Sequence, residues 1–275
     1  MSKARVIRHS LAKTGLRQPL VWSRHRGFNA NDVFIGSYPR SGSTWLRFLL
    51  VESLAGQSSG FKNVNELIPD VGDHGNAQAI LPGGGRVIKT HETYRASYQR
   101  AICLVRDPRD VVLSEYAYQK ALGLAGDDFD GYVTAFLRDG VNPFGTWTNH
   151  VRGWLDAAQK QPAQILVVRY EDLRQQTPKM LAKLMDFFGK KVDEAAILKA
   201  IENNSLERMQ AKEKVAPQRA SAKGKFIRSG SVKGWKEKLS VSQLERIQEY
   251  AGEAMLRLGY DAAVEAGEEA NTVRA

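Results

Sequence analysis

The chain has 275 residues, with 40 Lys or Arg against 30 Asp or Glu and a single cysteine. This length allows one large α/β domain or two small ones, each with a sizeable core. The lone Cys103 excludes an internal disulfide framework, which favours a reducing, cytoplasmic location. Its apolar neighbours favour a buried core residue over a nucleophile. No segment approaches the ~20 apolar residues of a membrane span, so none is expected.

The net charge of +10 raises the possibility of a nucleic-acid binder. The excess is concentrated, because residues 208–238 hold ten Lys or Arg against two acidic residues. Aromatic residues are not interleaved through this stretch as a stacking platform for bases requires. A small polyanionic ligand suits it at least as well, and no nucleic-acid partner is expected. The basic residues 1–30 are expected to form a helix or arm on the domain, with an organelle transit peptide as the alternative.

The hydrophobic pattern predicts strands that alternate with helices in one domain over residues 31–260, followed by a frayed tail from residue 261. Residues 56–85 are expected to form a long loop with a short helix. The pattern is typical of a mostly parallel sheet covered by helices on both faces, whose ligands bind at the carboxyl ends of the strands. Strands are predicted at 31–37, 86–89, 100–105 and 164–168, and helices at 44–54, 108–122, 130–138, 146–159, 178–188, 193–203 and 241–257.

The first strand is followed by a turn that has the features of an anion site. Residues 36–45 read Gly-Ser-Tyr-Pro-Arg-Ser-Gly-Ser-Thr-Trp. Backbone N–H groups and the helix dipole point at a ligand where a Gly/Ser loop enters a helix. Ser41, Ser43 and Thr44 would add hydroxyl donors. A capped helix start with incidental serines is the structural alternative.

This turn is not a Walker A loop. Its two glycines, Gly36 and Gly42, are one residue too far apart, and Ser43 stands where the lysine should be. The cation lies inside the loop as Arg40. A fixed cation without an arrangement for a Mg²⁺-bound triphosphate suits sulfuryl transfer, since a transferring sulfuryl group carries less negative charge than a phosphoryl group.

The second and third strands also end in chemically useful groups. Arg106 follows the third strand and can fork onto a phosphate, with Ser114 one to two helical turns later. Arg109 is expected in a structural ion pair with Asp107 or Asp110. Lys89 and His91 end the second strand, where a histidine can act as a general base near neutral pH.

Together these motifs resemble the cytosolic-type PAPS-dependent sulfotransferase family, where PAPS is 3′-phosphoadenosine-5′-phosphosulfate. Residues 38–45 are similar to its 5′-phosphosulfate loop, usually Y-P-K-S-G-T-T-W, and residues 106–114 to the segment that grips the 3′-phosphate. Lys-Thr-His at 89–91 stands where the family carries its catalytic base. Further matches are Tyr-Glu-Asp at 170–172, residues 204–209 of the adenine pocket, and residues 228–236, which resemble R-K-G-x-x-G-D-W-K.

The resemblance implies a P-loop-like three-layer α/β/α fold with a central, mostly parallel sheet of about five strands. It implies PAPS as donor, adenosine 3′,5′-bisphosphate (PAP) as product, and a basic cofactor lid over residues 210–238. The catalytic groups would be His91, Arg40 and Lys89, and Glu171 and Asp172 would be structural. The groups that hold the nucleotide would be Arg40, Ser41, Gly42, Ser43, Thr44, Trp45, Arg106, Ser114, Tyr170, Ser205, Leu206, Arg228, Ser229 and Gly230.

Several positions depart from the family pattern. Arg40 replaces the loop lysine, and an arginine can assist a departing oxygen only by hydrogen bonding because it does not give up its proton in practice. Leu206 stands where an aromatic residue is common. Ser229 replaces a lysine, and Lys233-Gly234 replaces Gly-Asp.

The sequence thus predicts in-line transfer of a sulfuryl group from PAPS to a hydroxyl or amine of a small-molecule acceptor. No metal is expected, since no His/Asp/Glu cluster has ligand spacing. A nucleoside-triphosphate-dependent kinase and a non-enzymatic nucleic-acid binder are the alternatives. Residues 56–85 and 119–150 are expected to wall the acceptor pocket, with an aromatic lining or core of Tyr132, Phe136, Phe144 and Trp147.

Overall fold

The structure is a computed structural model that describes residues 17–216, 227 and 230–261. Four parallel strands form its sheet in the order β2-β1-β3-β4. They are β1 (Val33–Ser37), β2 (Val87–Thr90), β3 (Arg100–Val105) and β4 (Ile165–Arg169). The four strands predicted from the sequence are confirmed to within two residues at each end. Within the described residues the sheet has one strand fewer than the five or so that the resemblance implies.

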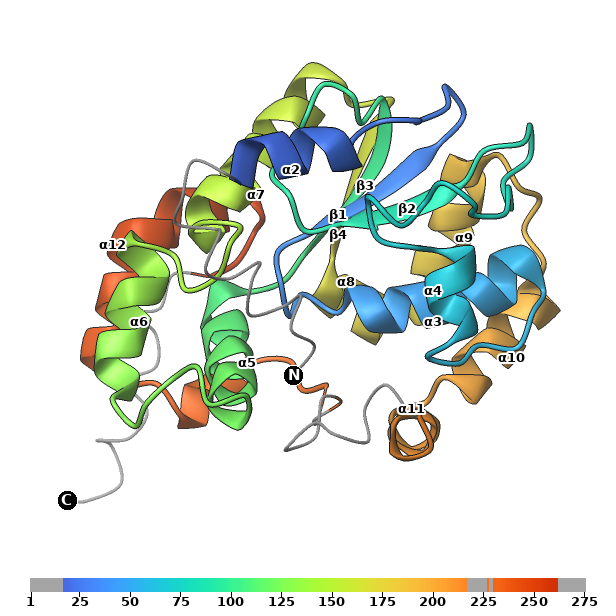
Figure 1. Ribbon diagram of the computed structural model, residues 1–275. Coiled ribbons are helices and arrows are strands. Elements are labelled where there is room, and N and C mark those ends of the chain that lie inside the picture. Colours follow the sequence, from blue (N-terminus) through green and yellow to red (C-terminus); the bar gives the residue numbers. More distant parts are fainter. Residues whose placement is uncertain (1–16, 217–226, 228–229, 262–275) are drawn as a thin grey trace.

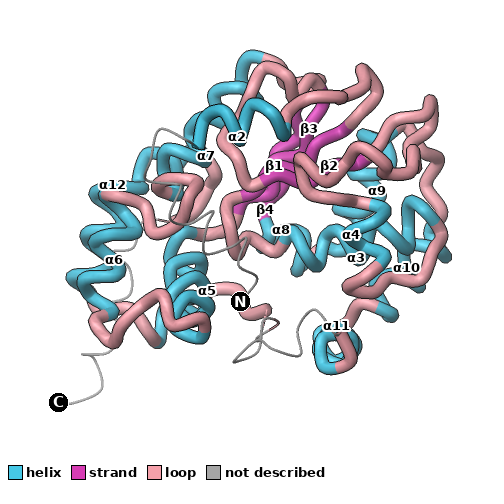
Figure 2. The backbone as a smooth tube through the Cα atoms, in the orientation of Figure 1, coloured by secondary structure: helices cyan, strands magenta, loops and turns pink. Residues whose placement is uncertain are grey.

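The helices surround the sheet, which lies at the centre of the molecule (Figure 2). Their bounds are α2 (Arg17–Arg24), α3 (Ser43–Ala55), α4 (Asn63–Leu67), α5 (Pro108–Ala121), α6 (Phe129–Arg138), α7 (Trp147–Lys160), α8 (Tyr170–Gln175), α9 (Thr177–Phe188), α10 (Glu194–Asn203), α11 (Leu206–Lys214) and α12 (Val241–Arg257), with a 3₁₀ turn at Gly234–Glu237. The predicted helices are confirmed, while α8 and α11 were not predicted. Because α11 continues to Lys214, the first five residues of the expected basic lid are helical. In the described ranges, no helix is both long and apolar enough to cross a membrane.

Two core clusters lie on opposite faces of the sheet, which confirms the three-layer architecture. Alternate residues of β1 point to opposite sides: Phe34 packs with residues of α6, α7 and α12, whereas Val33 and Ile35 pack with residues of α3, α9 and α10. Figure 1 shows these two groups of helices on either side of the strands. Cys103 lies in the first cluster, and burial raises the pKa of its thiol, so the expected structural role is confirmed.

Gly36 brings a helix unusually close to the central strand. A Cβ atom at this position would lie 2.1 Å from the Trp154 ring of α7. Only a glycine allows this approach, which places α7 against the carboxyl end of β1. Since parallel neighbours end at the same edge, the loops after β1, β2 and β3 meet there.

Candidate functional site

The loop between β1 and α3 has the backbone geometry of an anion cradle. Gly42 immediately precedes α3 with φ 94°, and Arg40 takes the left-handed conformation with φ 68°. A side chain at Gly42 would place its Cβ 2.5 Å from the Tyr170 ring, so the position requires glycine. The loop leads into the 13-residue helix α3. The backbone N–H groups of Ser43 and Thr44, at the start of this helix, do not take part in the intrahelical hydrogen bonds that satisfy the later turns.

Ser41 adds a hydroxyl to this cradle. The residue is fully buried, and among the described residues its Oγ atom has no hydrogen-bond partner. A buried hydroxyl without a partner costs free energy unless a ligand satisfies it. The loop therefore carries an unused donor at a predicted phosphate site.

Arg40 and Arg106 meet at the edge of this loop. The Arg40 Nε–H group donates to Ser114 Oγ at 3.1 Å, and its guanidinium lies 4.8 Å from the Tyr118 ring centroid. Arg106 donates to the Arg40 carbonyl at 3.2 Å and to the Ser231 carbonyl at 2.9 Å. The structure thus brings together the groups predicted for the 5′-phosphosulfate and for the 3′-phosphate.

One N–H donor of Arg106 is not used by any of the described residues. Its Nε atom is buried without a partner among the described residues, and its guanidinium lies 4.6 Å from the centroid of the Tyr170 ring. The neighbouring Arg109 instead forms a buried ion pair with Asp107 at 2.7 Å and stacks 3.9 Å from the Trp235 ring centroid. The expected structural ion pair of Arg109 is confirmed.

Tyr170 and Trp45 form an aromatic corner beside the loop. Their rings meet edge to face with centroids 6.2 Å apart. The Tyr170 hydroxyl donates to the Gly230 carbonyl at 3.1 Å, and burial raises the pKa of this phenol. The Trp45 indole N–H donates at 2.9 Å to the carbonyl of Asn204, the first residue of the segment 204–209 that the resemblance assigns to the adenine pocket.

The remaining predicted nucleotide-binding residues lie around this corner or outside the described part of the chain. Ser205 is exposed and caps α11 by accepting from the Arg208 amide at 3.3 Å, and Leu206 is half-buried at the start of that helix. Gly230 adopts a positive φ of 59°. Arg228 and Ser229 lie outside the described residues.

The Tyr-Glu-Asp segment supports the site with two carboxylates that are structural, as expected. Asp172 pairs with Arg169 at 2.7 Å. Glu171 accepts from the Asp107 amide at 3.1 Å and from the Tyr260 hydroxyl at 2.8 Å, and burial raises its pKa. These bonds fix the end of β4 against the start of α5.

His91 lies at the carboxyl end of β2 with one ring nitrogen fixed. Its Nδ1 atom is 2.7 Å from the Ser37 carbonyl oxygen, which can only accept, so Nδ1 carries the proton and the Nε2 lone pair remains the acceptor. Burial, together with the nearby Lys89 ammonium, lowers the pKa of His91 to about 3. The half-buried ring is therefore neutral near pH 7.

Lys89 is buried and forms an ion pair with Asp70, its Nζ atom 2.7 Å from Oδ1. Although burial alone would raise the pKa of Asp70, the cations of Lys89 and Arg47 hold it well below its ordinary value. Asp70 was not predicted, because a loop aspartate has no local signal. A backbone bridge to Lys89 places it here.

Of the four aromatic residues proposed for the acceptor pocket, one lies beside His91. The Phe144 ring centroid is 5.4 Å from that of His91. Phe136 and Trp147 are fully buried members of the core, and Tyr132 packs against it. No group of three or more His, Cys, Asp or Glu side chains that could hold a metal ion occurs within the described ranges.

Comparison with known proteins decides the family. The sequence model of the sulfotransferase domain family matches residues 30–259. The chain belongs to the sulfotransferase family. This confirms the resemblance and the enzyme class predicted from the sequence.

Individual sulfotransferases of known sequence or structure also match this chain over most of its length. Human sulfotransferase 1C2 is 27% identical over 260 residues, covering 83% of this chain and 85% of the relative. Rat sulfotransferase 2A1 is 28% identical over 242 residues, covering 82% and 84%. The fold matches that of mouse sulfotransferase SULT7A1 complexed with PAP, with a TM-score of 0.65 and 22% identity over 86% of this chain and 88% of that one. A retinol dehydratase complexed with retinol and PAP gives a TM-score of 0.63 at 19% identity, with 86% of each chain covered.

Proposed function

We propose that this enzyme transfers the sulfuryl group of PAPS to a hydroxyl or amine of a small-molecule acceptor. The observation that carries the proposal is the meeting of Arg40, Ser114 and Arg106 beside the loop that opens α3. Two guanidiniums converge there on a helix N-terminus, as a ligand with separate anionic groups requires. The solved relatives complexed with PAP support this choice of nucleotide.

The unused donors of the site fit that ligand. Ser41 Oγ and Arg106 Nε are both buried without a partner in the described part of the chain. Anionic oxygens of the 5′-phosphosulfate and the 3′-phosphate would satisfy them, with the loop amides at Ser43 and Thr44. Arg228, Ser229 and Gly230 remain sequence-based assignments to the 3′-phosphate side.

The residues at the strand ends supply the chemistry. His91 Nε2 accepts the proton of the acceptor hydroxyl or amine while the acceptor atom forms its bond to sulfur. The bond between sulfur and the bridging oxygen breaks, and Arg40 stabilises the charge on that oxygen by hydrogen bonding. Lys89, held in place by its ion pair with Asp70, would donate to the sulfuryl oxygens. The products are PAP and a sulfated acceptor.

The acceptor is proposed as a small molecule with an apolar or aromatic body. Phe144 beside His91 provides an aromatic surface near the proposed base. Retinol dehydratase structures, which share the fold, hold retinol or androsterone together with PAP.

A PAPS-fed screen of hydroxyl and amine compounds tests the function. We expect an acceptor to gain the mass of one SO₃ group in step with PAP release, and a His91→Ala enzyme to show neither change. Wild-type enzyme that binds PAP but transfers nothing to any acceptor class would contradict the assignment of transferase activity. A protein that binds no PAP would contradict the donor assignment as well.

A further inference from the structure

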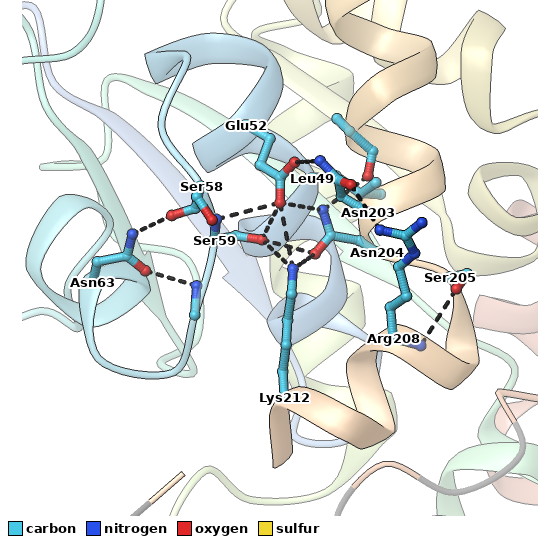
Figure 3. Close-up of polar contacts among 12 residues, drawn as sticks. Leu49, Glu52, Ser58, Ser59, Asn63, Asn203, Asn204, Ser205, Arg208 and Lys212 are labelled. Carbon is cyan, nitrogen blue, oxygen red and sulfur yellow. Dashed lines mark hydrogen bonds and ion pairs between the residues drawn. The ribbon is translucent and has the colours of Figure 1, made fainter. Parts of the chain in front are cut away.

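A polar cluster joins segments that lie far apart in the sequence, next to the proposed nucleotide site (Figure 3). Glu52 lies in the last turn of α3, Ser59 in the loop that follows, Asn203 and Asn204 at the end of α10, and Lys212 on α11. We call these five residues the α3–α11 cluster.

The cluster is densely hydrogen-bonded. The Glu52 carboxylate accepts from the Asn203 amide at 2.7 Å, from the Asn204 amide at 3.0 Å and from the Ser59 hydroxyl. The Lys212 ammonium donates to Ser59 Oγ at 2.9 Å and to Asn204 Oδ1 at 2.8 Å. It lies 3.4 Å from the Glu52 carboxylate, so a cation and an anion share the same neutral partners.

The two charged side chains of the cluster are largely buried. The Glu52 side chain is 8% exposed and that of Lys212 is 24% exposed. Although burial alone would raise the pKa of Glu52, hydrogen bonds from Ser59 and the two asparagines hold it below its ordinary value. Burial lowers the pKa of Lys212. Removing one charge of such a pair leaves the other buried without compensation, so the cluster firmly joins α3 to α11.

Asn204 connects this joint to the aromatic corner. Its side chain belongs to the cluster, while its backbone carbonyl accepts the indole N–H of Trp45 at 2.9 Å. Trp45 in turn meets the edge of the Tyr170 ring. The chain continues from Asn204 directly into Ser205 and Leu206, which start α11. A displacement of Asn204 would therefore move both proposed walls of the adenine pocket.

The helix α11 depends on this joint because little else of it is buried. Met209 is its one buried residue. Ile227 contacts this helix through its amide, which donates to Glu213 at 2.9 Å, and its carbonyl, which accepts from Gln210 at 3.4 Å. Lys212 thus adds a polar tie between α11 and α3 to the apolar packing of Met209.

We infer that Lys212 and Glu52 are positioning residues for the donor nucleotide, which they do not touch. They fix Asn204, and through it Trp45 and Leu206, in the arrangement that receives the adenine ring. The inference rests on the proposed function. It assigns a role to Glu52 at the far end of α3, which the sequence motifs do not include, and to Lys212, which the resemblance placed only within the basic lid at 210–238.

Lys212→Met tests this role because it keeps the length of the side chain and removes its charge and donors. We expect the Kd for PAP and the KM for PAPS to rise about tenfold, the equivalent of about one hydrogen bond to a charged group. The kcat at saturating substrates and the KM for the acceptor should stay within about twofold, because the reacting groups lie on other elements. Lys212→Arg should restore most of the affinity. Lys199→Met, at an exposed position on α10, is the matched control and should bind PAP like wild type.

A double-mutant cycle with Trp45→Phe tests the route through Asn204. Both changes disturb the placement of the same indole, so their combined loss of PAP affinity should be smaller than the product of the single losses. A thermal unfolding curve of each variant serves as the control that the protein used for calorimetry is folded. Should Lys212→Met not fold, Ser59→Ala removes one hydroxyl of the cluster without removing a charge, and a smaller rise in Kd is expected.

Two results would overturn the positioning role alone: wild-type PAP affinity in folded Lys212→Met, or losses that multiply in the cycle. An equal fall in kcat for all variants without a change in Kd would mean a general loss of structure and would overturn it as well. Wild-type protein that does not bind PAP would instead overturn the proposed function beneath it.

Discussion

The Nε–H group of Arg40 donates a hydrogen bond to the hydroxyl of Ser114 at 3.1 Å. Arg40 belongs to the loop assigned to the 5′-phosphosulfate, whereas Ser114 lies on α5 and is assigned to the 3′-phosphate. Their contact shows that the two halves of the proposed site adjoin. It also fixes a guanidinium where the family carries a lysine.

Arg40→Ala is expected to lower kcat by about 10²–10³-fold, the usual cost of removing one group that stabilises charge in a transition state. Arg40→Lys should keep most of the activity, because an ammonium restores the cation and can also donate a proton. The measurement is kcat at saturating PAPS and acceptor. Equal activity of the alanine variant and the wild type would exclude Arg40 from the chemistry.

His91→Ala is expected to lower kcat by about 10²–10⁴-fold, the usual contribution of a general base. Calorimetry should find its Kd for PAP nearly unchanged, since the imidazole faces the acceptor in the proposed arrangement. A variant with normal turnover would remove His91 from the mechanism.

The pH dependence of His91 follows from its lowered pKa of about 3. The folded ring therefore stays neutral as the pH falls from 8 to 5. The unfolded chain takes up a proton at this histidine below about pH 6.5, so stability is lost progressively from there down toward pH 3. The His91 ring signal in NMR spectra, assigned by its loss in His91→Gln, should not titrate in that window. A titration centred near 6.5, the ordinary value for histidine, would show that the ring is not held neutral.

Asp70→Asn is expected to lower kcat about tenfold while PAP affinity stays the same. Asp70 holds the Lys89 ammonium at 2.7 Å, but its side chain is 44% exposed, so its contribution to stability should be at most about 1 kcal/mol. Asp70→Glu should recover activity. Asp73→Asn is the control, since the exposed Asp73 pairs with Arg24 at 3.8 Å and not with Lys89. A normal kcat in Asp70→Asn would mean that Lys89 needs no partner there.

The sequence predicted the sheet and the loops at its carboxyl edge because these depend on local signals. Continuous apolar runs mark β1 and β3, and the glycine and serines after β1 mark the anion cradle. The contacts of Asp70 and Asn204 could not be predicted in the same way, although the resemblance included Asn204 in the adenine-pocket segment. Each gains its role from partners far away in the sequence, Asn204 from Trp45 and Asp70 by bridging to Lys89.

The helix α11 was not predicted because its sequence lacks a local signal of a helix. Its residues are mostly charged or polar, with Met209 as its single buried side chain, so no apolar stripe distinguishes it from a basic loop. It is stabilised by the Ser205 cap and by the ion pair of Lys212 with Glu52, and both depend on the folded context.

Activity is expected to survive an excess of EDTA. The loop after β1 has no lysine in the Walker position, and the described residues contain no cluster suited to a metal ion. The assay measures sulfated product with and without the chelator, with Mg²⁺ added back as the control. Complete loss on chelation, restored by Mg²⁺, would instead indicate the kinase chemistry of the alternative interpretation.

The central claim is that the site requires a 3′-phosphate. Arg106, whose buried Nε has no partner in the described part of the chain, and Ser114 would bind it, and Arg228 is assigned to it from the sequence. Charge-assisted hydrogen bonds are worth about 1.5–3 kcal/mol each, so the loss of two arginine contacts should cost about 10²–10⁴ in affinity.

Calorimetric titration of the wild-type protein and of Arg106→Ala and Arg228→Ala, each with PAP and with AMP, tests this claim most directly. We expect wild type to bind PAP about 10²–10⁴ times more tightly than AMP. Each variant should lose much of its affinity for PAP while its affinity for AMP hardly changes. Equal affinity of the wild-type protein for the two nucleotides would contradict the assignment of the 3′-phosphate site, and with it PAPS as the donor.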